Sequence, residues 1–336
     1  MKRTFIIAEM SANHCGDLEF AKRTVEAAKR SGADAVKVQT YTADTMTLDC
    51  RREEFRIRGS GQWDGRYLHE LYAEAAMPWA WHRELKDVAD SIGIEFFSTP
   101  FDRTAVDFLE GIGVGRYKIA SFEAVDLPLI RHAAAKGKPL IISTGICTPE
   151  EMQAAVEACK EAGNDDVTLL KCTSSYPAEP ESMHLATISD MIRRFAPQGV
   201  KIGLSDHTMT PETAVVAVSL GAQVVERHFT LDRSRGGADA AFSATPGEFK
   251  EMVASIRMAE RLLGEADYSV NGAARAFRRS LFVCEDIRAG EIFTERNIRS
   301  IRPGCGCAPD RLRSIVGRRA KVDLARGTPM REEYVA

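Results

Sequence analysis

Eight short runs of apolar, often β-branched residues recur along most of the chain, and they constrain its fold more than any other feature. Runs of this length and composition are typical of buried strands. Stretches with helical periodicity separate them, as at residues 18–31, 79–92, 149–162 and 211–220. The predicted strands lie at residues 4–9, 35–39, 95–98, 117–120, 140–143, 167–171, 201–205 and 223–229.

Alternation of this kind fits two α/β architectures, a (β/α)8 TIM barrel and a doubly wound sheet. The doubly wound sheet needs a glycine-rich phosphate-binding turn after an early strand. The first run here leads into residues 9–14 (EMSANH), and the glycines of residues 111–115 precede a strand instead of following one. Eight strand–helix units are what a TIM barrel requires, so the barrel is predicted. Natural helix ends support the register, at Gly32, Gly93, Gly137, Gly163 and Gly221.

The pattern changes after Gly264. A polar stretch at residues 265–277 precedes short β-like pieces and turns rich in glycine and proline. We therefore predict a barrel at residues 1–264, a linker at residues 265–277, and a small C-terminal domain at residues 278–336.

Composition excludes several classes of protein. The 336 residues carry a net charge of −3, so no global basic field would hold nucleic acid or an anionic membrane. The apolar run near the N-terminus is too short for a signal peptide, and no stretch approaches a membrane span. The eight cysteines include no C-x-x-C pair, and residues 305–307 (CGC) are interpreted as a loop. We expect a cytoplasmic protein with reduced thiols.

Polar side chains follow the predicted strands at the point where each strand ends. In a barrel these carboxyl ends meet at one rim and build the active site. Lysines at three of the ends, Lys37, Lys118 and Lys171, suit a phosphorylated or carboxylated substrate because ammonium groups neutralise the anion. Hydroxyls would satisfy its remaining oxygens. The other end residues include Glu9, Gln39, Thr99, Ser121, Ser143, Ser174 and Ser205.

Two histidines stand at the ends of consecutive predicted strands, His207 and His228. Either one alone is more often a hydrogen-bonded loop residue than a ligand. Together, on a rim of polar groups, they indicate half of a catalytic metal site that is open to substrate. A second interpretation remains, in which Lys118 or Lys171 forms a Schiff base with a carbonyl substrate. That chemistry needs neither histidine.

Taken together, these motifs resemble the sialic acid synthase (NeuB-like) family. The tail, with residues 278–281 (RRSL), 289–291 (AGE), 301–304 (IRPG) and 326–329 (RGTP), resembles that family's antifreeze-like SAF domain, of β-clip type. The resemblance implies a transferase that condenses phosphoenolpyruvate with an amino sugar aldehyde. The barrel motifs that carry it are residues 9–14 (EMSANH), 37–42 (KVQTYT), 98–102 (STPFD), 117–123 (YKIASFE), 143–145 (STG), 203–208 (GLSDHT) and 226–230 (ERHFT).

Within the family the chain is most similar to the pseudaminic acid branch. The opening EMSANH and residues 237–243 (GADAAFS) follow that pattern, although Ala238 and the CGC loop depart from family usage. The implied sugar is 2,4-diacetamido-2,4,6-trideoxy-L-altrose. N-acetylneuraminate and legionaminate synthesis are the alternatives, and a non-enzymatic sugar-binding scaffold is a third. Other phosphoenolpyruvate-condensing barrels would not be expected to carry this tail.

The resemblance also implies a role for each site residue. His207 and His228 would bind a divalent metal, Mn²⁺ before Mg²⁺ or Co²⁺, because hard cations prefer oxygen to imidazole. Glu9 would stabilise charge or activate water at C2 of the enol, and Asp239 would lie near the sugar. Phe242 would offer apolar surface to the sugar, and Arg302 would reach its acetamido group across a domain-swapped homodimer. The phosphate and carboxylate would be held by Lys37, Thr99, Lys118, Ser121, Ser143, Ser174 and Ser205, and Gln39 would also bind substrate.

Overall fold

The computed structural model describes residues 3–59, 63–269 and 272–336. The chain divides into two compact units, Met1–Gly264 and Glu265–Ala336. Residues 270–271 of the predicted linker lie outside the described part. Among the helices of the described residues, none is both long and apolar enough to cross a membrane. All eight cysteines are free thiols.

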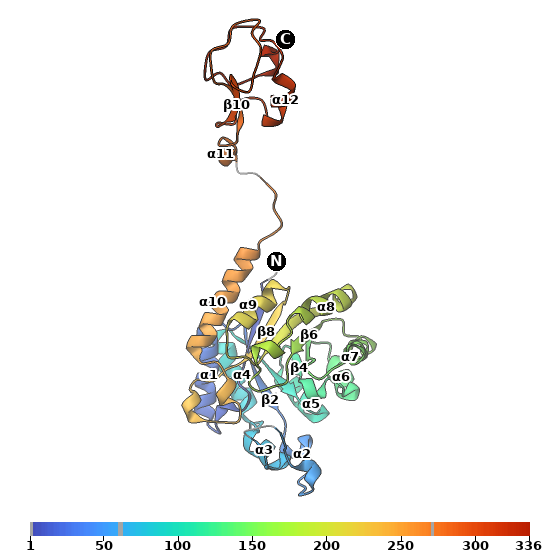
Figure 1. The fold of residues 1–336 in the computed structure, drawn as a ribbon. Coiled ribbons are helices and arrows are strands. Elements are labelled where there is room, and N and C mark those ends of the chain that lie inside the picture. Colours follow the sequence, from blue (N-terminus) through green and yellow to red (C-terminus); the bar gives the residue numbers. More distant parts are fainter. Residues whose placement is uncertain (1–2, 60–62, 270–271) are drawn as a thin grey trace. The chain divides into compact units, whose positions relative to one another are not determined.

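The first unit is a closed barrel of eight parallel strands, as predicted (Figure 1). Each strand pairs with the next in sequence, and the last closes the barrel by pairing Glu9 with His228. The predicted boundaries differ from the observed ones by no more than about two residues. The strands are β1 (Phe5–Glu9), β2 (Ala35–Thr40), β3 (Glu95–Pro100), β4 (Tyr117–Ile119), β5 (Leu140–Ser143), β6 (Val167–Cys172), β7 (Lys201–Asp206) and β8 (Val224–His228).

Helices surround the barrel and bury apolar faces against it (Figure 1). Their ends follow local capping rules. Asp17 accepts a hydrogen bond from the Phe20 amide, and Thr148 forms a capping box with Glu151. Gly93 ends its helix at φ 70°, a conformation that favours glycine. The helices are α1 (Leu18–Arg30), α4 (Trp81–Ile92), α5 (Arg103–Ile112), α6 (Leu127–Ala134), α7 (Pro149–Glu161), α8 (Ala186–Phe195), α9 (Glu212–Ser219) and α10 (Pro246–Leu263).

Shorter elements follow several strands at the carboxyl end of the barrel. The connection from β2 to α4 carries α2 (Ala43–Met46) and α3 (Leu68–Ala75), which project from this end in Figure 1. The 3-10 helices η1 (Ser11–His14), η3 (Ser121–Glu123) and η7 (Ala240–Phe242) follow β1, β4 and β8. These segments supply side chains beyond the strand ends themselves.

The second unit has its own small core. Strands β9 (Ser280–Val283) and β10 (Ile298–Ile301) pair antiparallel, with Val283 opposite Ile298. Both of these residues are buried, and so are Phe293 and Met330. Two short helices complete the unit, α11 (Gly272–Arg275) and α12 (Leu312–Ile315). A core of this size is consistent with an independent domain.

Candidate active site

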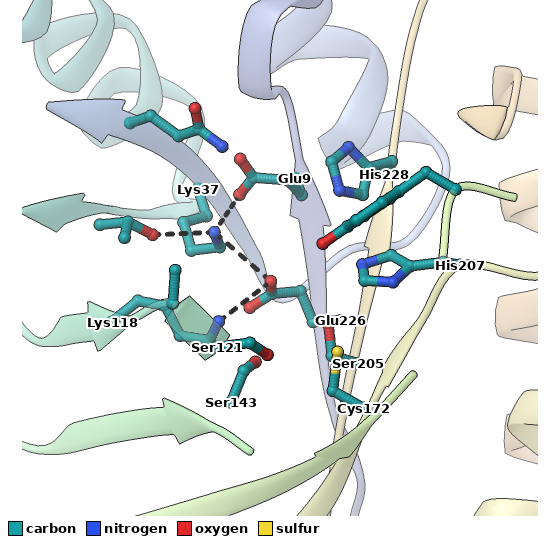
Figure 2. Close-up of a pocket in the computed structure, with 14 residues that line it drawn as sticks. Glu9, Lys37, Lys118, Ser121, Ser143, Cys172, Ser205, His207, Glu226 and His228 are labelled. Carbon is teal, nitrogen blue, oxygen red and sulfur yellow. Dashed lines mark hydrogen bonds and ion pairs between the residues drawn. The ribbon is translucent and has the colours of Figure 1, made fainter. Parts of the chain in front are cut away.

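A polar cavity lies at the carboxyl ends of the barrel strands (Figure 2). All eight strands or the turns that follow them contribute to it, because alternate residues of each barrel strand face inward. The structure thus brings together most of the residues predicted from the strand ends. The lining consists of Glu9, Lys37, Gln39, Thr99, Lys118, Ala120, Ser121, Ser143, Cys172, Tyr176, Ser205, His207, Glu226 and His228.

Buried ion pairs form the floor of this cavity. The ammonium of Lys37 contacts the carboxylate of Glu9, lies 3.4 Å from Oε1 of Glu226, and donates a 3.0 Å hydrogen bond to Thr99 Oγ1. The Lys118 ammonium lies 3.4 Å from the same Glu226 oxygen. All four charged side chains are at most 6% exposed. Such groups are retained in a protein interior only when they are paired.

Burial and neighbouring charges shift the pKa values of the side chains that form this floor. Burial raises the pKa of Glu9, although Lys37 opposes the shift. Burial alone would lower the pKa of Lys37, but the attraction of Glu226 and Glu9 outweighs it and raises that pKa. Burial lowers the pKa of Lys118, which the attraction of Glu226 offsets only in part. Two ammonium groups and two carboxylates cancel when all are ionised, so the floor by itself offers little net charge to an anion.

The two histidine rings lie close together beside the cavity (Figure 2), with centroids 5.3 Å apart and planes inclined at 61°. His207 Nδ1 lies 2.9 Å from the carbonyl oxygen of Thr173, an arrangement that places the proton on Nδ1 and leaves Nε2 as an acceptor. His228 Nδ1 is buried and has no hydrogen-bond partner among the described residues. Burial lowers the pKa of His228 well below its usual value, which favours the neutral imidazole that metals bind.

These observations fit a divalent metal held by two imidazoles. Within the described residues, no group of three or more His, Cys, Asp or Glu side chains converges as a complete metal site. A pair of ligands would leave most coordination positions to substrate and water, as catalytic sites require. The orphaned Nδ1 of His228 is the specific sign of an absent partner.

The predicted Gln39 and Asp239 belong to a hydrogen-bonded chain at the side of the cavity. Gln39 Nε2 donates to Ser11 Oγ at 2.9 Å, and Ser11 Oγ donates to Oδ2 of Asp239. Burial raises the pKa of Asp239, although the Ser11 bond opposes this. Asp239 lines a second, neighbouring cavity of about 330 Å³, together with Ser11 and Gln39. Gln39 lines both cavities, so this hydrogen-bonded group lies where the two cavities adjoin.

Four predicted residues take other positions. Lys171 was expected to line the cavity but does not, because Cys172 is the β6 residue that faces inward. The ammonium of Lys171 instead donates to Cys172 O and Thr173 Oγ1. Ser174 does not line the cavity. Its hydroxyl lies so close to Gly145 that a Cβ on that glycine would collide with it. Phe242 is 1% exposed and lines neither cavity; its ring packs 5.0 Å from His228. Arg302 belongs to the second unit and is exposed.

Three lining residues, Ala120, Cys172 and Tyr176, were not predicted. A fourth, Glu226, belongs to the strand ends predicted to form the pocket, but no role was predicted for it. It precedes His228 by two residues, so strand alternation places both on the same face. Cys172 follows from the same alternation once β6 is known to extend to it. Burial would raise the pKa of the Cys172 thiol, but the hydrogen bond and charge of His207 lower it to about 7. Tyr176 and Ala120 lie beyond their strands, where alternation carries no information.

A buried ion pair lies on the outer face of the two strands that carry the histidines. Asp206 and Arg227 are opposite each other in register, one residue before His207 and His228. Arg227 Nη1 lies 3.2 Å from Asp206 Oδ2, and the guanidinium also donates to the carbonyls of Thr208 and Thr210. Asp206 Oδ1 accepts from the amide and hydroxyl of Thr208. This network fixes the ends of β7 and β8, and with them both imidazoles.

Arg227→Met should therefore lower the free energy of unfolding by about 3–5 kcal/mol at pH 7, because it leaves Asp206 buried without a counter-charge. Burial already raises the pKa of Asp206, with Arg227 opposing the shift. Without Arg227 that pKa should rise further, so the loss of stability should shrink as acid protonates Asp206. Urea unfolding at pH 7 and pH 5 measures both effects. The double variant Asp206→Asn/Arg227→Met should recover part of the loss; an equal or greater loss would contradict the pairing.

Comparison with known proteins agrees with this architecture. The NeuB family model matches residues 24–268, and the SAF domain model matches residues 278–335. The pseudaminic acid synthase of Campylobacter jejuni is 44% identical over 334 residues, 98% of this chain and 96% of the relative. That of Helicobacter pylori is 44% identical over 97% of this chain and 96% of its own length.

A solved structure gives the same result. The N-acetylneuraminic acid synthetase of Leptospira borgpetersenii, in complex with citrate, superposes with a TM-score of 0.71 at 31% identity. The superposition covers 82% of this chain and 90% of that one. The family model covers more than half of the chain and the relatives cover nearly all of it. The chain belongs to the NeuB family and carries a C-terminal SAF domain.

Proposed function

We propose that this chain is a pseudaminic acid synthase, which condenses phosphoenolpyruvate with 2,4-diacetamido-2,4,6-trideoxy-L-altrose to give pseudaminic acid and phosphate. The observation that carries the proposal is the 44% identity to pseudaminic acid synthases over almost the whole chain. The cavity at the barrel mouth supports it, because it combines anion-binding groups with a pair of adjacent imidazoles.

Phosphoenolpyruvate carries a phosphate and a carboxylate, and the floor offers partners for both. Lys37 and Lys118 supply charge, and hydroxyls from four strands or turns surround them. Since Glu9 and Glu226 cancel the charge of the lysines, a further cation would strengthen anion binding. A divalent ion held by His207 and His228 would meet this need, and when bound it would act as a Lewis acid on a carbonyl oxygen. Mn²⁺ is the ion proposed.

Glu9 is proposed as the residue that handles the proton of the reaction. C3 of the enol forms a bond to the aldehyde carbon of the sugar, so the aldehyde oxygen becomes an alkoxide and cationic character develops at C2. Water adds at C2 and loses one proton, which finally protonates the alkoxide. The C2–O bond to phosphate then breaks, and the second proton of the water leaves with the phosphate as C2 becomes a ketone. A buried carboxylate with a raised pKa can stabilise the cation and then accept the first of these protons. The contact with Lys37 holds the carboxylate in place.

A domain-swapped homodimer is the proposed assembly, in which Arg302 of one chain reaches the barrel mouth of the other. Large apolar side chains are exposed on the turns after three barrel strands: Phe122 at 58%, Ile146 at 46% and Met209 at 41%. Exposed apolar groups gathered on one end of a barrel are typical of a surface that another chain covers. A second copy of this chain is the proposed partner.

Substrate preference tests the proposal. Phosphate release from phosphoenolpyruvate should be measured with three sugars side by side: the diacetamido altrose, N-acetylmannosamine and the legionaminic acid precursor. The first should give the highest kcat/KM, because a site built to bond two acetamido groups penalises a sugar that lacks one. A kcat/KM for N-acetylmannosamine that equals or exceeds this value would replace the proposal with sialic acid synthesis.

A further inference from the structure

The connection between β2 and α4, residues 41–80, is far longer than the roughly 2–6 residues usual for such a loop. Connections of this length in compact domains are usually functional. It begins at the carboxyl end of β2, directly after Gln39 and Thr40, and carries α2 and α3 at that end of the barrel (Figure 1). Its side chains are therefore placed beside the active-site cavity.

This connection forms one side of the second cavity, of about 330 Å³. The second cavity shares Gln39, Ala120, Tyr176 and His228 with the polar cavity, so the two cavities adjoin beside His228. A ligand whose reacting end lies at the histidines would extend into it. The connection contributes several apolar side chains to the lining of this cavity, and we call four of them, Met46, Ile57, Trp63 and Leu68, the apolar wall.

Aromatic residues also line the second cavity, among them Tyr41, Tyr72 and Phe101. Tyr41 is 4% exposed and packs edge to face against Tyr72 and Phe101, with ring centroids 6.0 and 5.2 Å apart. Trp79 Nε1 donates a 3.1 Å hydrogen bond to the carbonyl oxygen of Tyr41. Edge-to-face pairs and a satisfied indole fix these rings in one arrangement. This part of the cavity lining is therefore preformed.

Other residues that line the second cavity are polar. They include Asp239, Ser11 and Glu123, and burial raises the pKa of Glu123 to about 7. A ligand in this cavity therefore meets hydrogen-bonding groups as well as apolar ones. A sugar with hydroxyls at every carbon would place some of them against the wall, where they would lose their hydrogen bonds to water. A sugar with methyl-bearing groups there would lose nothing.

We infer that the apolar wall selects the deoxy end and acetamido methyl groups of the sugar. The inference rests on the proposed function and deepens it, because it assigns the choice of sugar to the β2–α4 connection. Phe242, predicted for this role, is covered by His228 and does not line the second cavity. The wall is a specificity determinant and takes no part in the bond-making chemistry.

Two variants test the wall, Trp63→Ala and Leu68→Asn. Each should lower kcat/KM for the diacetamido altrose by roughly tenfold to a hundredfold, the range that lost apolar contacts produce in enzyme pockets. The ratio of this kcat/KM to that for N-acetylmannosamine should fall by a similar factor. The KM for phosphoenolpyruvate should change little, because its partners lie on the polar floor. Tyr67→Ala is the matched control: it removes an aromatic from the same connection at a position that lines neither cavity.

The outcomes separate the two proposals. If the wild-type protein prefers N-acetylmannosamine, the proposed function is wrong, and the proposed selection by the apolar wall is wrong as well. A wild-type preference for the diacetamido altrose that both variants leave unchanged overturns the wall alone. Equal losses for every sugar, matched by Tyr67→Ala, would also overturn it, since they would reflect damage to the connection.

Discussion

Removal of divalent metal should abolish phosphate release from phosphoenolpyruvate, and added Mn²⁺ should restore it. Burial lowers the pKa of His228, whose Nδ1 has no hydrogen-bond partner among the described residues, and the two imidazole rings lie 5.3 Å apart. Lewis-acid activation of a carbonyl contributes several kcal/mol to a transition state. His207→Ala and His228→Ala should therefore each lower kcat by about a thousandfold or more, at roughly 1.4 kcal/mol per factor of ten.

A matched control separates metal binding from folding. His132 pairs with Asp107 on the surface, so His132→Ala removes an imidazole without touching the cavity and should keep wild-type activity. Circular dichroism should show that all three variants fold, and titration with Mn²⁺ should show tight binding only in the wild type and the His132 variant. Full activity in excess chelator would contradict the metal role. It would favour a Schiff base on Lys118, whose pKa is lowered by burial.

The barrel could be predicted almost strand by strand because two independent sequence patterns agree. Fully buried parallel strands appear as continuous apolar runs, and glycines mark the helix ends that precede them. The predicted runs at residues 140–143 and 35–39 match β5 and most of β2. Both patterns lie within short stretches of sequence, so they can be recognised without knowledge of tertiary contacts. His207, His228, Glu9 and Lys37 followed from the barrel, since its topology decides where strand ends meet.

The direction of each side chain was predicted less well, because it depends on whether the residue falls at an odd or an even position along its strand. The sixth strand was expected to end at Lys171, but β6 continues to Cys172, and the thiol faces the cavity where the amine was expected. Successive residues of a strand point to opposite faces, so a shift of one residue in the strand end changes which side chain faces the cavity. Phe242 shows a second limit. Its burial behind His228 depends on how the segment after β8 folds back, which local sequence does not encode.

Co-expression of two impaired variants should restore part of the activity, measured at a sugar concentration well below the KM. Glu9→Gln removes the proposed proton acceptor on the barrel floor, and Arg302→Ala removes the proposed contact to the acetamido oxygen. Consider a domain-swapped dimer of one Glu9→Gln chain and one Arg302→Ala chain. One of its sites contains both substitutions, and the other site contains neither. Random pairing makes about half of the dimers mixed, so about a quarter of the wild-type activity should return. Steady-state phosphate release per active-site pair measures the recovery.

Two controls make the result decisive. Arg302→Ala alone should remain dimeric in sedimentation and lose chiefly sugar affinity, because a guanidinium contact to a neutral oxygen contributes roughly 1.5–3 kcal/mol. Co-expression of Glu9→Gln with His207→Ala should restore nothing, because both residues line the same barrel cavity and every site keeps one lesion. Recovery in that pair would mean that wild-type sequence had been regenerated. If the Glu9 and Arg302 variants also fail to complement, each site is built within one chain, and the swapped assembly is wrong.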